Sequence, residues 1–166
     1  RKYCLRREAD TLKISLLASR EKISPDYALS FFDRLQFAGD SIGAHADLIR
    51  SGQSREHISL SLELARTGEF RCLARGMKPL FFRRRTGRLY LLPAATDGVR
   101  IVEGRFRPGD VLLAAPVRFP LSERREIAER FSQALRDGFE PENLGTLLDA
   151  WLDYRQRGRA LMIART

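Results

Sequence analysis

The sequence lacks the residues and runs on which several protein classes depend. It has only two cysteines, Cys4 and Cys72, in separate strand-like segments. This predicts buried thiols rather than a disulfide framework or a metal site. No apolar run approaches the roughly 20 residues of a membrane helix, no signal peptide opens the chain, and no Walker-type or dinucleotide glycine motif occurs. We therefore expect a cytoplasmic protein, or the cytoplasmic domain of a larger, membrane-attached protein.

Acidic residues are also in deficit. Thirty Lys and Arg stand against 21 Asp and Glu, for a formal net charge of +9. Such a balance favours acidic partners, but a solvated basic surface explains it equally well. The 166 residues, 43% of them hydrophobic, suit one domain with its own core. Because the first residue is Arg1, we expect residues 1–166 to be a single domain cut from a longer protein.

Strand and helix patterns alternate along the first half of the chain. Apolar and polar residues alternate over 11–18, and again over 58–64 and 70–74, which the Thr67-Gly68 turn joins as a hairpin. Ser24-Pro25 is typical of a helix start, and apolar spacing predicts a helix over 25–38. A second, shorter helix is predicted over 42–49, although it carries Gly43.

The second half continues with a hairpin over 79–92 and a buried strand within 106–119. A Pro108-Gly109-Asp110 turn leads into that strand. Helices are predicted from Ser122 and from Pro141, and a last short strand over 160–164. This order predicts an α+β fold, namely an α/β/β/α sandwich of two largely antiparallel sheets flanked by helices.

Four segments in this order resemble the SpoIIE-like branch of the PPM metal-dependent Ser/Thr protein phosphatases. Residues 12–25 are similar to the family's strand, Asp-x-Ser-Gly-x-Gly turn and helix start. Residues 74–88 resemble its Asn-Ala-Gly-His-Pro-Pro hairpin without the Asn and His. Residues 106–119 and 158–165 resemble the segments that carry its Thr-Asp-Gly and Asp-x-Thr-Leu motifs. The resemblance covers essentially the whole chain and implies the same sandwich.

The positions that match the family's metal ligands do not carry acidic residues in this sequence. In the family, carboxylates at strand ends hold two divalent cations, and a bridging water attacks the phosphoryl group. Here the early Asp falls near Tyr3 and the Asp of the glycine-rich turn on Ala18. The Asp-Gly pair falls on Val117 and Arg118, and the late Asp on Gly158. The resemblance therefore implies a pseudophosphatase with no metal, no other cofactor and no catalytic residue.

Two other features of the sequence are weaker candidates for a metal-binding or catalytic site. Thr96-Asp97-Gly98-Val99 contains the family's Thr-Asp-Gly motif, but it lies before the Pro-Gly-Asp turn rather than after the strand that follows this turn. Asp97 would also supply only one ligand, which is too few for a two-metal centre. We therefore read it as an exposed turn. His45 and His57 are the only histidines, and spacing alone supplies neither a metal cluster nor a catalytic triad.

The leading hypothesis is thus a catalytically inactive domain that acts through protein–protein contacts in bacterial signalling. The expected partner is a signalling regulator or another phosphatase domain, with a homodimer as a further arrangement. Nucleic acid is not expected. The candidate contact residues are Phe31, Arg34, Arg83, Arg84, Arg85 and Arg118.

Two alternatives stay open at this point. One is an anion-binding module for nucleic acid or lipid headgroups. It would use the arginines of the hairpin region: Arg71, Arg75, Arg83, Arg84, Arg85 and Arg88. The other is an active phosphatase whose metal ligands have been displaced.

Overall fold

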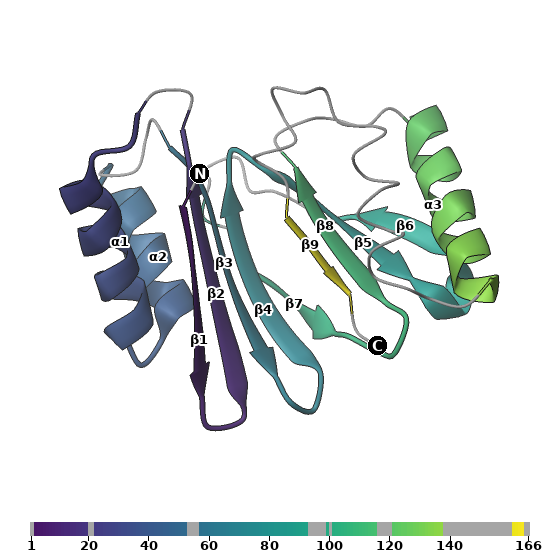
Figure 1. Cartoon of the computed structure of the whole chain (residues 1–166), viewed down its shortest axis with the longest axis horizontal. Helices are drawn as coiled ribbons and strands as arrows, with labels where there is room; N and C mark the ends of the chain where they lie inside the picture. Colours follow the sequence, from purple (N-terminus) through teal and green to yellow (C-terminus); the bar gives the residue numbers. More distant parts are fainter. Residues whose placement is uncertain are drawn as a thin grey trace. The chain divides into compact units, whose positions relative to one another are not determined.

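Two antiparallel sheets and three helices make up the described part of the chain (Figure 1). The computed structural model describes residues 2–19, 22–52, 57–92, 99, 101–115, 121–137 and 161–164. They belong to two compact units. The first comprises Arg1–Met77 with Pro93–Arg105, and the second Lys78–Leu92 with Phe106–Thr166. The α+β class with antiparallel sheets is confirmed, whereas the single domain over 1–166 stays a prediction.

The first unit holds a five-stranded sheet in the order β1-β2-β3-β4-β7, with two helices. Its elements are β1 (Lys2–Glu8), β2 (Thr11–Ala18), α1 (Pro25–Phe37), α2 (Ser41–Arg50), β3 (Ile58–Ala65), β4 (Glu69–Arg75) and β7 (Val102–Arg105). The sequence patterns predicted most of these elements but missed β7. That strand has only four residues, Glu103 and Gly104 among them, so it shows no apolar alternation.

The second unit holds a four-stranded sheet in the order β6-β5-β8-β9, with one helix. Its elements are β5 (Lys78–Arg83), the 3-10 turn η1 (Arg84–Thr86), β6 (Arg88–Leu91), β8 (Val111–Ala115), α3 (Leu121–Arg136) and β9 (Leu161–Ala164). Phe131 on α3 meets Phe82 on β5 edge to face, with ring centroids 5.5 Å apart. The helix predicted from Pro141 lies outside the described residues. None of the helices in the described part of the chain has the length and apolar character of a membrane span.

Both helices of the first unit start at side-chain caps. The Ser24 hydroxyl accepts a hydrogen bond from the Tyr27 N–H at 3.4 Å, and Pro25 occupies the first turn of α1, as predicted. Asp40 caps α2 by accepting from the Gly43 N–H at 2.9 Å. A Cβ on Gly43 would stand 2.6 Å from the Asp40 carboxylate. Gly43 therefore leaves room for this cap, which explains why a glycine occurs in the predicted helix.

The face of the first sheet beneath α1 and α2 carries buried polar side chains beside the apolar Leu17 and Leu73, and this is the main departure from expectation. The alternation over 11–18 predicts one buried and one solvated face, yet Lys13 and Ser15 are buried. The Lys13 ammonium donates to the Ala38 carbonyl oxygen at 3.0 Å and pairs with Glu8 at 2.7 Å. Gln36 on α1 donates to the Ser15 hydroxyl at 3.4 Å. The helices thus cover the face that holds the polar residues of the alternation, while the opposite face carries its apolar residues.

The two predicted hairpins fall in different sheets. β4 ends at Arg75 in the first sheet and β5 begins at Lys78 in the second, so Gly76 and Met77 alone connect them. Gly76 has a φ of +68° and its position faces Ile58, whose Cγ1 would lie 3.1 Å from an added Cβ. Glycine suits this position because its backbone conformation is left-handed and the space is occupied.

The two cysteines differ in burial, and we expect their reactivity to differ. Burial raises the pKa of the Cys72 thiol to about 12, whereas Cys4 on β1 is half-buried. Since the thiolate is the reactive form, one thiol per chain should react with Ellman's reagent in the native protein. The second should react only in denaturant. A Cys4→Ser variant should show no native reactivity, and rapid labelling of that variant would contradict the assignment.

Candidate functional site

The structure brings together the two family ligand positions that it describes. Tyr3 pairs with Leu16 across β1 and β2, so Ala18 lies two residues further along the neighbouring strand on the same face as Tyr3. This is the face opposite α1 and α2, because Ser15 and Lys13 point to the helices. Two carboxylates at these positions would stand side by side, as a shared metal site requires.

The side chains at this position do not fit a pair of hard cations. A methyl group and a neutral phenol stand where Mg²⁺ or Mn²⁺ would need carboxylate oxygens. Across the next strand, Ala18 pairs with Ile58, which adds another apolar side chain. In the described ranges, no group of three His, Cys, Asp or Glu residues could hold a metal ion. Val117, Arg118 and Gly158 lie outside the described residues, as does Asp97.

Two further family positions also lack polar side chains. The Asn and His of the family hairpin fall on Ala74 and Met77, and Met77 is buried. The hairpin glycine, by contrast, is retained as Gly76. The hairpin thus keeps Gly76, which its backbone conformation favours. It lacks the Asn and His side chains of the family, which could bind an anion or a metal.

Asp110 in the Pro-Gly-Asp turn is a carboxylate with a structural role. It is 1% exposed and accepts hydrogen bonds from the backbone N–H groups of Arg107 at 2.9 Å and Arg84 at 3.0 Å. The Arg83 guanidinium pairs with it at 3.3 Å. Asp110 therefore joins the turn before β8 to the turn after β5, and its oxygens are already used.

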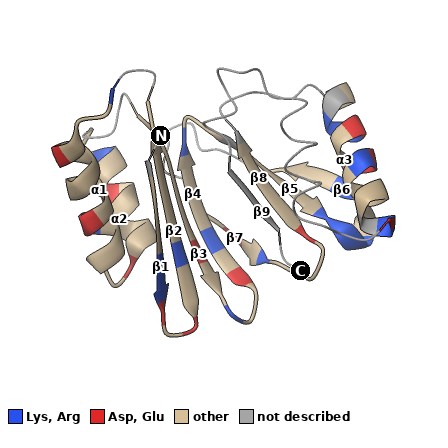
Figure 2. Cartoon of the chain, in the orientation of Figure 1, with Lys and Arg blue, Asp and Glu red and all other residues tan. Residues whose placement is uncertain are grey.

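The arginine turn predicted as a contact surface is only partly available. Arg83 pairs with Asp110 and lies over the Phe81 ring at 4.9 Å, so its charge has a partner inside the unit. Arg84 and Arg85 are exposed. Basic side chains mark this turn and recur along α3, where acidic residues alternate with them (Figure 2).

On α1 the structure corrects one predicted contact residue. Phe31 is 2% exposed and packs with Leu17 and Leu35 in the core, so it does not lie on the surface as a partner contact requires. Its helical face turns toward the sheet. Arg34 is exposed, as predicted. The exposed apolar residues of the helix are Leu29 and Phe37, the latter at 76%, and sequence spacing alone did not single them out.

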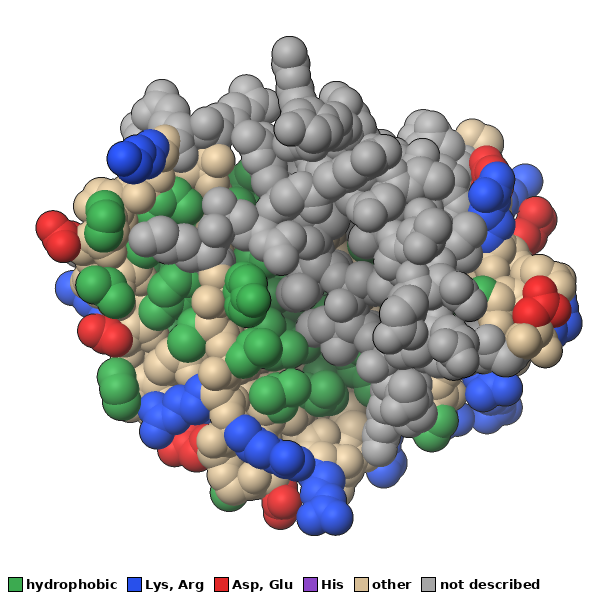
Figure 3. Space-filling view, viewed as in Figure 1, with side chains coloured by type: hydrophobic (Ala, Val, Ile, Leu, Met, Phe, Trp, Pro, Cys, Tyr) green, Lys and Arg blue, Asp and Glu red, His purple; other side chains and the backbone are tan. Residues whose placement is uncertain are grey.

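β1 adds exposed apolar side chains at the edge of the first sheet. Tyr3 and Leu5 are both more than half exposed. They share the face opposite the helices, since Leu5 pairs with Ile14 and Tyr3 with Leu16. Figure 3 shows apolar side chains gathered over the strands of this sheet on the face in view. Small exposed apolar groups of this kind are common on contact surfaces.

His45 forms a buried network that sequence spacing did not reveal. Its Nε2 lies 2.8 Å from the Ser59 hydroxyl and its Nδ1 2.8 Å from the Ser61 hydroxyl. Burial, aided by the positive charge of Arg75, lowers the pKa of His45 to about 4. All three side chains are fully buried. The arrangement has no carboxylate to orient the imidazole and no access for a substrate, so it is structural. His57 instead stacks on Tyr27, with ring centroids 4.5 Å apart.

The arginines of the anion-binding alternative do not form one free surface. Arg71 pairs with Asp40 at 3.1 Å, with Glu63 at 3.3 Å and with Glu103 at 3.3 Å. Its charge is thus more than balanced. Arg71 and Arg75 belong to the first unit and the other four to the second. Within the described ranges, the charge of Arg71 is thus already used by carboxylates rather than available to a nucleic-acid backbone.

Comparison with known proteins finds relatives by structure only. No protein-family model matches the sequence, and no curated protein matches it. RsbX in complex with magnesium superposes with a TM-score of 0.66, at 10% identity, over 97% of this chain and 83% of RsbX. The SiaA-PP2C domain of Pseudomonas aeruginosa gives 0.64, at 13% identity, over 99% of this chain and 79% of that one.

A third structure is the PP2C phosphatase domain, with a fragment of the regulatory domain, of the cell fate determinant SpoIIE from Bacillus subtilis. It gives a TM-score of 0.63, at 12% identity, over 97% of this chain and 56% of that chain. All three likenesses cover nearly the whole chain, and they agree with the order of motifs in the sequence. The chain therefore has the fold of PPM-type phosphatases, including their SpoIIE-like branch.

Proposed function

We propose that this chain is a catalytically inactive PPM-fold domain that acts through protein contacts in bacterial signalling. The observation that carries the proposal is that Tyr3 and Ala18 share one face of neighbouring strands, two residues apart in the register. The register places them side by side where the family has carboxylates, and neither side chain can replace a carboxylate. The chain thus keeps the backbone arrangement and has lost the chemistry at both described positions.

The contact role is supported by the outer face of α1. Leu29 and Phe37 are exposed at the spacing of one helical face, with Asp33 between them. This face thus offers a protein partner two exposed apolar side chains with a carboxylate between them. SpoIIE, a cell fate determinant with the same fold, combines its phosphatase domain with a regulatory domain. By analogy, the expected partner is a signalling regulator or another phosphatase-fold domain, and a second copy of this chain is a further candidate.

Manganese calorimetry combined with turnover of p-nitrophenyl phosphate tests the proposal. We expect no saturable heat of Mn²⁺ binding and no manganese-dependent hydrolysis above the rate without protein. RsbX, whose structure holds magnesium, is titrated in parallel as the control for binding of a divalent cation. Saturable Mn²⁺ binding together with hydrolysis that a chelator abolishes would instead establish the active phosphatase with displaced ligands.

A further inference from the structure

β6 presents an edge to which another strand can be added. It is the outer strand of the second sheet, and no described strand pairs on its far side. The Leu92 N–H donates to the Pro79 carbonyl at 2.9 Å, which sets the alternation of the β5–β6 ladder. The N–H and C=O groups of Leu89 and Leu91 consequently point away from β5, toward the free edge.

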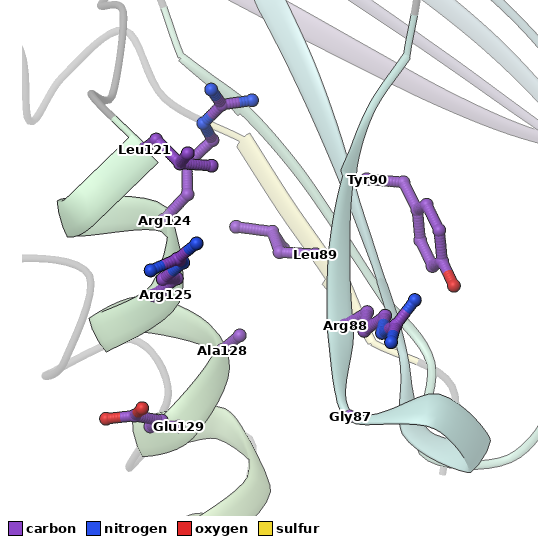
Figure 4. A pocket seen from close by; sticks show the side chains of 9 residues that line it. All are labelled: Gly87, Arg88, Leu89, Tyr90, Leu121, Arg124, Arg125, Ala128 and Glu129. Atoms are coloured by element: carbon purple, nitrogen blue, oxygen red, sulfur yellow. The ribbon is translucent and has the colours of Figure 1, made fainter.

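An apolar groove lies beside this edge. A cavity of about 530 Å³ separates β6 from the first half of α3. In Figure 4 the Leu89 side chain points from β6 toward the helix, with Leu121 and Ala128 on the helix side. Leu121 is 58% exposed and Leu91 half exposed, so the groove is open to an incoming side chain.

The surroundings of the groove are positively charged. Arg124 and Arg125 come from the first turns of α3, whereas the Arg88 side chain leaves β6 on the side away from the helix (Figure 4). The Nε of Arg124 is buried and has no hydrogen-bond partner within the described part of the chain. The carboxylate of Glu129, the acidic residue among those lining the cavity, points away from β6 (Figure 4). The groove therefore offers guanidinium donors to carboxylates.

We propose that β6 and α3 bind an extended, acidic segment of a partner protein, which adds to the second sheet as a strand beside β6. Backbone pairing with Leu89 and Leu91 would align the segment. Because successive side chains of a strand alternate, those on one face would enter the groove, where acidic residues meet Arg124 and Arg125, and apolar ones on the other face would lie beside Tyr90. This surface is separate from α1, and the inference goes beyond the proposed function because it does not depend on the loss of the metal centre.

The test uses a short, end-capped fluorescent peptide in which glutamate and valine alternate, with binding followed by anisotropy. We expect saturable binding to the full chain. Replacing glutamate with lysine, or N-methylating alternate amides, should each weaken binding by about tenfold or more, since they remove charge complementarity or backbone pairing. These peptide arms need no protein variant.

A pair of variants locates the site. Arg124→Glu with Arg125→Glu should also weaken binding by about tenfold. Arg136→Glu, the same type of change in the last turn of α3, should leave affinity unchanged. Circular dichroism checks that each variant is folded.

Three outcomes would each overturn the proposal. They are equal binding of the N-methylated peptide, no saturable binding, and a dimer formed through β6 that the peptide does not dissociate. No arm involves metal or phosphate turnover, so its failure is distinct from failure of the proposed function.

Discussion

Replacing Asp110 with alanine is expected to lower the free energy of unfolding by about 3 kcal/mol, because it leaves two partly buried backbone N–H groups without their acceptor. Those groups belong to Arg84 and Arg107, and the substitution also removes the partner of the Arg83 guanidinium. Arg83 is about one quarter exposed, so water replaces part of its lost interaction. Urea denaturation followed by circular dichroism measures the change.

Two further variants separate this role from the loss of one surface charge. Asp110→Asn keeps a carbonyl acceptor, so we expect a smaller loss, about 1 to 2 kcal/mol. Asp47 is mostly exposed and pairs only with Arg50 three residues away among the described contacts, so Asp47→Ala should cost less than about 1 kcal/mol. If Asp110→Ala were no more destabilising than Asp47→Ala, the buried carboxylate would not join the two turns as described.

Acid should destabilise the first unit through His45, by about 3 kcal/mol in total. Its pKa is about 4 in the folded chain against an ordinary value of 6.5, because burial penalises the imidazolium. Between these values the unfolded chain takes up a proton that the folded chain excludes. The stabilising contribution is therefore complete above about pH 6.5, falls as the pH drops, and is lost below about pH 4.

The measurement compares wild type with a His45→Gln variant by urea denaturation from pH 7.5 to pH 4. Carboxylates titrate in both proteins, so the difference between the two curves isolates the histidine. We expect that difference to shrink steadily toward pH 4, because only the wild type has this buried imidazole. His57→Gln is the matched control, since His57 is half-buried and stacks on Tyr27. Parallel curves for wild type and His45→Gln would show that His45 is not excluded from protonation.

Local patterns predicted the elements well where a cap or turn coincided with apolar spacing. Ser24-Pro25 marked the start of α1, and the hairpin from β3 to β4 followed from its alternation and Thr67-Gly68. Partner strands could not be predicted in the same way, because pairing depends on residues far apart in the sequence. The hairpin over 79–92 predicted that β5 pairs with β6, but not that β5 also pairs with β8 or that β4 belongs to the other sheet.

Burial of the polar face could not be predicted from alternation alone. Period-two patterns show which residues share a face but not what covers it. Lys13, Ser15 and Ser61 look like solvent-facing residues, yet α1 and α2 supply hydrogen-bonding partners for all three. Similarly, the helical spacing of Phe31 placed it on an apolar face without showing that this face is turned inward.

The sequence predicted where the family ligand positions lie, but it did not predict the groove beside β6. Aligning motifs placed Tyr3 and Ala18 at strand ends, and the register of β1 with β2 puts them side by side. The groove beside β6 carries no sequence signal, because Leu89, Leu121 and Arg124 come together only through the packing of α3 on β6. Arg124 and Arg125 look like ordinary exposed positions of an amphipathic helix until that packing is known.

The polar side chains that bond the first sheet to α1 and α2 also fix the position of these helices along the sheet. Displacing the helices along the sheet by one turn, about 5.4 Å, would separate Lys13 from the Ala38 carbonyl, Ser15 from Gln36, and His45 from both hydroxyls at once. Together with the close-packed apolar contacts of Leu17 with Phe31 and Leu35, these directional bonds fix one position of the helices on the sheet. A force applied to α1 by a bound partner would therefore act on the helix and the sheet together.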